Sequence, residues 1–241
     1  HVSIEYESNP ILQDVSLELQ PGARMVLVGD NGSGKTTLLS LLLGDHPRSF
    51  ALSEQQLSLW GAARDAPRNA HVLLQRRIGH MSPELFHAFP RKSLKAGGLT
   101  VADAIASGFD GIFTYRRRNE KQLERVAQLL RLFSPELVFD SKSMSSESVG
   151  DLPFASLTHG SQAVVLFLRA LVHRPSLLIL DEAFQGMSGH QVAKTRAFID
   201  GTQSWVYEGM SDTERAVDRA WREKVVIVAV SHYESEWPLT C

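Results

Sequence analysis

Residues 26–37 read Val26-Leu27-Val28-Gly29-Asp30-Asn31-Gly32-Ser33-Gly34-Lys35-Thr36-Thr37, an apolar strand that runs into the pattern G-x-x-x-x-G-K-T. The glycines allow backbone conformations that side chains would block, so that successive N–H groups and a helix N-terminus can surround phosphate groups. The leucine-rich segment 38–43 indicates that helix. A glycine-rich turn without a ligand is the alternative, but the strand before it and the helix after it favour a phosphate-binding loop.

Each residue of this loop has an expected role. Lys35 is expected to reach the β- and γ-phosphates of a nucleotide, and the Thr36 hydroxyl to hold Mg²⁺. The sequence thus predicts ATP and Mg²⁺ as ligands, with further nucleotide contacts from Gly29, Asn31, Gly32, Ser33, Gly34 and Thr37.

The composition is that of a folded α/β protein. The chain has 241 residues, of which 43% are hydrophobic and 22% charged, so it can form one large domain or a core with a subdomain, and general disorder is excluded. A net charge of −2 gives no overall attraction to nucleic acid or anionic lipid, although the local patch 116–118 is triply basic. The only cysteine is Cys241, so no disulfide can form within the chain.

No apolar run is long enough to cross a bilayer, and the longest, at 163–172, contains Arg169. A membrane role would therefore need a separate partner. The chain begins at His1 and stops shortly after an apolar strand at 225–230, so we expect a fragment of a longer protein. A soluble protein of the cytoplasm or of an organelle matrix is expected.

The order of the predicted elements alternates between strands and helices. Partial alternation at 11–19 predicts an antiparallel pair leading into the strand 25–28, and 45–72 is a loop-rich connection before strand character returns at 72–78. The later elements are helices at 100–107 and 119–133, an exposed loop at 141–148, a helix at 161–172, a buried strand at 177–180, helices at 191–199 and 212–222, and the strand 225–230. We predict a mostly parallel core sheet formed by 1–81 and 156–241, with an antiparallel edge and an inserted helical subdomain at about 82–155.

A second chemical motif follows the buried strand. Asp181 directly follows a run of four aliphatic residues. It is expected to bind Mg²⁺, which takes oxygen ligands. Glu182 is placed to act as general base on the attacking water, and His232, after the next strand, to position that water against the γ-phosphate. Without the phosphate loop, an ordinary loop carboxylate and a core histidine would be the usual interpretations.

These motifs resemble, in this order, those of the ATP-binding cassette (ABC) ATPases, a P-loop NTPase family, and the resemblance covers essentially the whole chain. It identifies 26–37 as Walker A, Asp181-Glu182 as Walker B and His232 as the switch histidine. Residues 156–162 fall where the family has its signature motif, with Thr158 and Gly160 at nucleotide-contacting positions. Tyr6 falls where the family stacks an aromatic ring on adenine. The resemblance implies ATP hydrolysis between two face-to-face cassettes, so that the expected partner is a second cassette.

The chain also departs from the family pattern. His159 and Ser161 replace a glycine and the glutamine of the signature, and Ser188 replaces an Asp that communicates across the dimer. The His159 ring is expected either to obstruct the phosphate or, if protonated, to offer it a cation. The glutamine of the Q-loop is absent, and Glu84 nearby either approaches Mg²⁺ or is simply solvated.

Three functions remain open from the sequence. The runs 82–85, 184–186 and 231–234 resemble the molybdate-associated and photorepair-type ABC ATPases, which favours a soluble protein with two cassettes in one polypeptide. The alternatives are the ATPase subunit of a membrane transporter and a regulatory module that binds ATP with little turnover.

Overall fold

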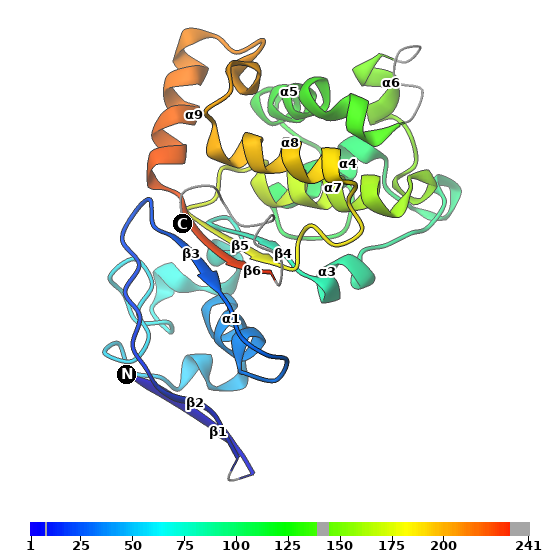
Figure 1. Ribbon diagram of the computed structural model, residues 1–241. Coiled ribbons are helices and arrows are strands. Elements are labelled where there is room, and N and C mark those ends of the chain that lie inside the picture. The colour runs from blue at the N-terminus through cyan, green and yellow to red at the C-terminus, as the bar shows by residue number, and fades with distance from the viewer. Residues whose placement is uncertain (8, 139–144, 232–241) are drawn as a thin grey trace.

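The central element of the fold is a parallel β-sheet. The computed structural model describes residues 1–7, 9–138 and 145–231. Four strands lie side by side (Figure 1) in the order β3 (Arg24–Leu27), β6 (Val226–Val230), β5 (Leu177–Asp181) and β4 (Ile78–Met81). All neighbouring pairs run parallel, which confirms the predicted parallel core sheet.

Helices cover both faces of this sheet. Because successive side chains of a strand point to opposite faces, Leu178 and Leu180 of β5 belong to one apolar cluster and Leu177 and Ile179 to another. Figure 1 shows α1 (Lys35–Leu43) on one side of the sheet and α7 (His159–Leu171) with α8 (Gly189–Asp200) on the other. A strand buried on both faces needs apolar residues at every position, which explains the continuous aliphatic run.

The antiparallel pair is present but lies elsewhere than predicted. β1 (Val2–Tyr6) pairs with β2 (Asn9–Val15) in a separate two-stranded sheet, not with the strand that precedes the phosphate loop. Ile4 and Leu12 of this hairpin pack against Leu41 of α1. The prediction of a pair leading into 25–28 was therefore wrong in its partner, because the first residues of the chain supply the second strand.

The strand predicted at 72–78 is also wrong. Residues 71–74 form a helical turn, α2 (His71–Leu74), in which Val72 is 62% exposed and Leu74 is buried. Strand pairing with β5 begins only at Ile78. The connection before it holds two short 3₁₀ turns, η1 (Pro47–Phe50) and η2 (Pro67–Asn69).

The predicted helices exist with shifted ends. They are α4 (Val101–Ala106), α5 (Glu120–Leu137), α7, α8 and α9 (Asp212–Lys224). Between β4 and α7 the chain also forms α3 (Pro83–Ala88) and α6 (Ser146–Gly150). The loop predicted at 141–148 is thus helical from Ser146, and its residues 141–144 lie outside the described part.

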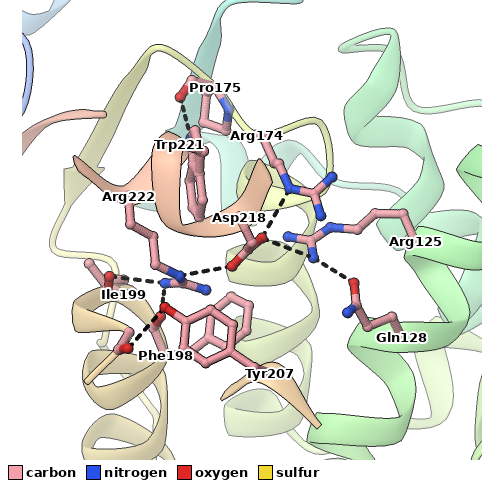
Figure 2. Close-up of polar contacts among 11 residues, drawn as sticks. Arg125, Gln128, Arg174, Pro175, Phe198, Ile199, Tyr207, Asp218, Trp221 and Arg222 are labelled. Atoms are coloured by element: carbon pink, nitrogen blue, oxygen red, sulfur yellow. Dashed lines mark hydrogen bonds and ion pairs between the residues drawn. The ribbon is translucent and has the colours of Figure 1, made fainter. Parts of the chain in front are cut away.

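A buried ion-pair network joins α9 to α5, as Figure 2 shows. The fully buried Asp218 carboxylate lies 2.9 Å from Arg222 Nε, 3.0 Å from Arg174 Nε and 3.5 Å from Arg125 Nη1. Burial by itself would raise the pKa of Asp218, but Arg125 and Arg222 outweigh it and the pKa is lowered. One ionised carboxylate is therefore the shared counter-charge of three guanidinium groups.

Two half-buried histidines, His80 of β4 and His173 after α7, give the fold a pH dependence. Burial lowers the pKa of His80 and of His173 to about 4. The unfolded chain binds these protons with the ordinary pKa of about 6.5. Stability from these groups is therefore present above pH 6.5 and lost as pH falls toward 4, by at most about 1.4 kcal/mol per pH unit for each histidine.

We expect His173→Gln to flatten the fall in unfolding free energy between these pH values, because one of the two titrating rings is gone. Urea unfolding at a series of pH values measures the unfolding free energy of both proteins. Equal slopes in the wild type and the variant would show that His173 does not contribute.

Candidate active site

Three segments follow the carboxyl ends of β3, β5 and β6, at the same edge of the parallel sheet. Leu27 at the end of β3 and Asp181 at the end of β5 both pair in register with Val230, the last residue of β6. The phosphate loop, the Asp181-Glu182 pair and the segment from Ser231 onward therefore start side by side. Ligands of open parallel sheets bind outside the carboxyl ends of the strands, so this edge is the candidate site.

The loop before α1 has the backbone shape of an anion cradle. Gly32 and Gly34 have φ angles of 83° and 90°, in the left-handed region that glycine tolerates. A Cβ on Gly34 would lie 2.8 Å from the Ile11 carbonyl oxygen, so a larger residue does not fit. Within the described chain, no side chain caps the start of α1, which leaves the N–H groups of its first turn available to an anion.

Lys35 and Thr36 begin α1. The Lys35 ammonium donates hydrogen bonds to the carbonyl oxygens of Gly29, at 2.7 Å, and Asp30, at 2.9 Å. Its charge therefore lies against the loop backbone itself. The predicted phosphate ligands form one continuous strand, loop and helix unit, and the exposed members include Asn31, Gly32, Ser33 and Thr36.

Asp181 has the electrostatic setting of a metal ligand. Burial, Glu84 and Glu182 raise its pKa to about 6, against a smaller opposing effect of Lys35. The ionised carboxylate is thus disfavoured in the protein alone, and a bound cation would favour it. Among the described residues, no three His, Cys, Asp or Glu side chains form a metal cage. Mg²⁺ is usually held by one or two carboxylates together with substrate phosphates, and Asp181 could be one of these carboxylates.

Glu182 follows Asp181 in an unusual backbone conformation. Its φ angle of 45° is in the left-handed region, which costs energy for a non-glycine residue. Its N–H donates to the Val230 carbonyl at 2.9 Å, and its carbonyl accepts from the Gln185 N–H at 3.1 Å. These two bonds fix the Glu182 backbone at the shared sheet edge.

Glu84 is a third carboxylate near this edge, for which the sequence interpretation left open an approach to Mg²⁺ or a solvated position. It is exposed in the first turn of α3, directly after β4. After burial it is the largest cause of the raised pKa of Asp181. The available signal was its position just after a strand, but only the sheet order reveals that β4 is the neighbour of β5.

The predicted signature segment begins α7. The Thr158 hydroxyl accepts a hydrogen bond from the Ser161 N–H at 3.3 Å and donates one to Ser161 Oγ at 3.0 Å, so Thr158 is the N-cap of the helix. A Cβ on Gly160 would lie 2.6 Å from the Gly186 carbonyl oxygen. Gly160 therefore permits close packing of α7 on the turn that follows β5.

The His159 ring packs against other parts of the same chain. Its centroid lies 4.4 Å from that of Phe86 in α3, and its Nδ1 occupies the space that a Cβ on Gly186 would need. The sequence predicted a ring that either obstructs a phosphate or offers it a cation. The structure adds a third arrangement, in which His159 joins α7 to α3 and to the turn after β5.

Two predicted site side chains lie outside the described part of the structure. His232 lies outside the described residues, and so does the Tyr6 side chain. Their roles stay predictions.

A family model described as ABC transporter matches residues 12–185. The chain belongs to the ABC transporter family. ABC cassettes are ATPases that bind ATP with Mg²⁺, and the match spans both the Walker A loop and the Walker B pair of this ABC cassette.

Curated relatives agree with this assignment. An uncharacterized ABC transporter ATP-binding protein of Schizosaccharomyces pombe is 30% identical over 239 residues, which cover 99% of this chain and 41% of the relative. The ABC transporter ATP-binding protein ModF of Escherichia coli is 36% identical over 198 residues, covering 82% and 36%. The cassette thus spans about two fifths of the length of these relatives. Other relatives are named import ATP-binding proteins for Fe(3+) ions or hemin.

Solved structures share the fold. A dimeric ATP-binding cassette bound to ADP and Pi in a post-hydrolysis state has a TM-score of 0.61 at 14% identity, covering 96% of this chain and 84% of the other. Within residues 1–7, 9–138 and 145–231, no helix is both long and apolar enough to cross a membrane.

Proposed function

We propose that this cassette hydrolyses ATP to ADP and phosphate while paired face to face with a second ABC cassette. The observation that carries the proposal is the convergence of the phosphate loop and the Asp181-Glu182 pair at one edge of the sheet. The second cassette belongs to the same polypeptide or to another subunit. A twin-cassette protein is supported by relatives that are more than twice as long as the segment they share with this chain.

Most of the proposed site residues bind the nucleotide, Mg²⁺ or the attacking water, and one residue takes part in proton transfer. Lys35 and the N–H groups at the start of α1 would bind the phosphates, and Thr36 and Asp181 would hold Mg²⁺. Mg²⁺ supplies charge neutralisation between phosphate oxygens. Glu182 would accept the proton of the attacking water. Of the residues beyond the description, His232 would position that water and the Tyr6 ring would stack on adenine.

The signature surface would serve the second cassette. Thr158 and Gly160 lie at the start of α7, whose N-terminus would present N–H groups to the γ-phosphate held by the partner. His159 and Ser161 depart from the usual signature motif. We therefore infer that the cassette contributes Walker residues to its own ATP site better than it contributes a signature motif to the site of its partner. A partner cassette with a more regular signature would complete its site.

We also infer the layout predicted from the sequence: a core of 1–81 and 156–241 with a helical subdomain at about 82–155. The run of helices from α3 to α6 supports it. The cytoplasm or an organelle matrix would be its compartment.

Lys35→Ala should weaken ATP binding about ten- to a hundred-fold, because a charge-assisted hydrogen bond to phosphate contributes about 1.5–3 kcal/mol. A nucleotide titration of the full-length protein measures this, with Lys95→Ala, a change at an exposed lysine, as the control. Equal ATP affinity in the wild type and Lys35→Ala would contradict the assignment of the phosphate loop.

The second candidate is the ATPase subunit of an ABC transporter, favoured by the relatives named as import ATP-binding proteins. Purification of the native protein in a stoichiometric complex with a polytopic membrane protein would support it. Purification without such a partner, in the absence of detergent, would support the twin-cassette protein.

A further inference from the structure

A cavity of about 210 Å³ lies beside β4, the edge strand of the parallel sheet, and is lined by residues of α1, α2 and α7 as well as of β4. Its wall contains three polar side chains that the proposed hydrolysis does not use, His80 of β4, Arg169 of α7 and His173 after α7. Two exposed residues, Asp45 and His71, also line it and place its opening at the surface. The cavity therefore has a partly polar wall and is accessible from outside.

Arg169 is a buried cation without a counter-charge. Arg169 is only 5% exposed, and its Nε–H donates a hydrogen bond to Ser107 Oγ at 2.9 Å. In the described chain no carboxylate forms an ion pair with it, and its other neighbours are aromatic, with Phe113 at 5.1 Å and Phe89 at 5.8 Å. Burying an unpaired charge is costly, so such a cation favours an anionic partner.

The terminal nitrogens of Arg169 differ in solvent access from those of the other buried arginines. Arg125 and Arg222 also have nitrogens without a hydrogen-bond partner, but those atoms are sealed from solvent, so a ligand cannot reach them. The Arg169 guanidinium lines the cavity, and its terminal nitrogens are not among the sealed atoms. Its planar fork is therefore open to a ligand, and a fork of this shape matches the two oxygens of a carboxylate.

The two histidines add uncharged polar groups to this wall. Both rings are neutral at neutral pH, because burial lowers the pKa of each to about 4. The neighbouring carboxylates, Asp45 and Glu84, lie near His80 and raise its pKa slightly against the effect of burial. Both ring nitrogens of His173 are sealed from solvent, so a ligand cannot reach them. One fixed positive charge is thus combined with the His80 imidazole, which can donate or accept a hydrogen bond, while the His173 ring lies close by.

We propose that this cavity binds a small carboxylate, held by the guanidinium fork of Arg169 beside His80 and His173. The volume is below the roughly 300–1,000 Å³ of pockets for drug-sized ligands, so only a short carboxylate fits. The carboxylate comes from a free small molecule or from an Asp or Glu side chain of another protein segment. The proposal does not depend on ATP binding, because none of the three residues is among those assigned to the nucleotide.

The test follows the histidine ring resonances of the full-length protein by NMR, with ¹³C-labelled histidine and chloride keeping the ionic strength constant. Acetate is the probe for a free carboxylate, and blocked aspartate, N-acetyl-aspartate amide, is the probe for a side chain. Acetamide is the control, because it has nearly the shape of acetate but no charge. His80→Gln and His173→Gln assign the two resonances.

We expect acetate to shift both resonances saturably and acetamide to bind at least about tenfold more weakly, since it lacks the charge-assisted bond. Arg169→Gln should weaken acetate binding about ten- to a hundred-fold, whereas Arg117→Gln, at an exposed arginine, should not. Saturation by acetate alone points to a free ligand, and saturation by blocked aspartate as well points to a side chain. No saturable shift, or equal binding of acetate and acetamide, would overturn the proposal even if Arg169→Gln fails to fold.

Discussion

Glu182→Gln should lower steady-state ATP turnover by a factor on the order of 10²–10⁴, the usual contribution of a general acid or base. The glutamine keeps the size of the side chain but cannot take the proton of the attacking water. ATP affinity should stay nearly unchanged, because Lys35 and the N–H groups of α1, and not Glu182, are the proposed phosphate contacts. Phosphate release from the full-length protein measures the rate, and nucleotide titration measures the affinity.

Glu84→Gln is the matched control for this change. Both carboxylates raise the pKa of Asp181, so both variants remove a negative charge from its surroundings. If Glu182 is the base, Glu84→Gln should cost less than about tenfold in rate, well below the range expected for a base. Equal losses in the two variants would mean that the effect arises from the charge near Asp181 and not from proton transfer.

Asp218→Ala should destabilise the fold by about 3–5 kcal/mol, the usual cost of leaving a buried charge without its partner. The carboxylate is fully buried, and its removal leaves the Arg125, Arg174 and Arg222 guanidinium groups without their shared counter-charge (Figure 2). The bonds from the Arg222 guanidinium to the Phe198 and Ile199 carbonyls cannot neutralise that charge. Denaturant unfolding measures the change in free energy.

Asp212→Ala, on the same helix α9, is the control for Asp218→Ala. Asp212 is exposed in the first turn, where a carboxylate contributes only about 0.3–1 kcal/mol through the helix dipole. A loss of stability in Asp218→Ala no larger than in Asp212→Ala would show that the three arginines are neutralised in another way.

The sequence predicts the parts of this site that are local. The strand, the glycine loop and the helix from Arg24 to Leu43 are adjacent in the chain, and each limits the conformation of the next. The aliphatic run before Asp181 predicts a strand covered on both faces, which β5 is. Spacing alone was enough here because each prediction concerned neighbours in sequence.

Features that depend on strand order and on packing at a distance were predicted in part or not at all. The sequence left open whether Glu84 approaches Mg²⁺ or is solvated, and its effect on Asp181 follows from the position of β4 next to β5, an order that neither segment encodes. The contact of His159 with Phe86 joins residues from separate elements, and the hairpin partner of β2 is β1 instead of the strand that follows it. The strand predicted at 72–78 failed because a short apolar run does not distinguish a helical turn from a strand.

The central claim is that one group of residues binds ATP and a different residue hydrolyses it. A single-turnover assay on the full-length protein, counting bound ATP and released phosphate in the same sample, tests this most directly. We expect Lys35→Ala to lose both bound ATP and phosphate release, and Glu182→Gln to keep bound ATP and lose phosphate release. Normal phosphate release from Glu182→Gln, with bound ATP equal to that of the wild type, would contradict it.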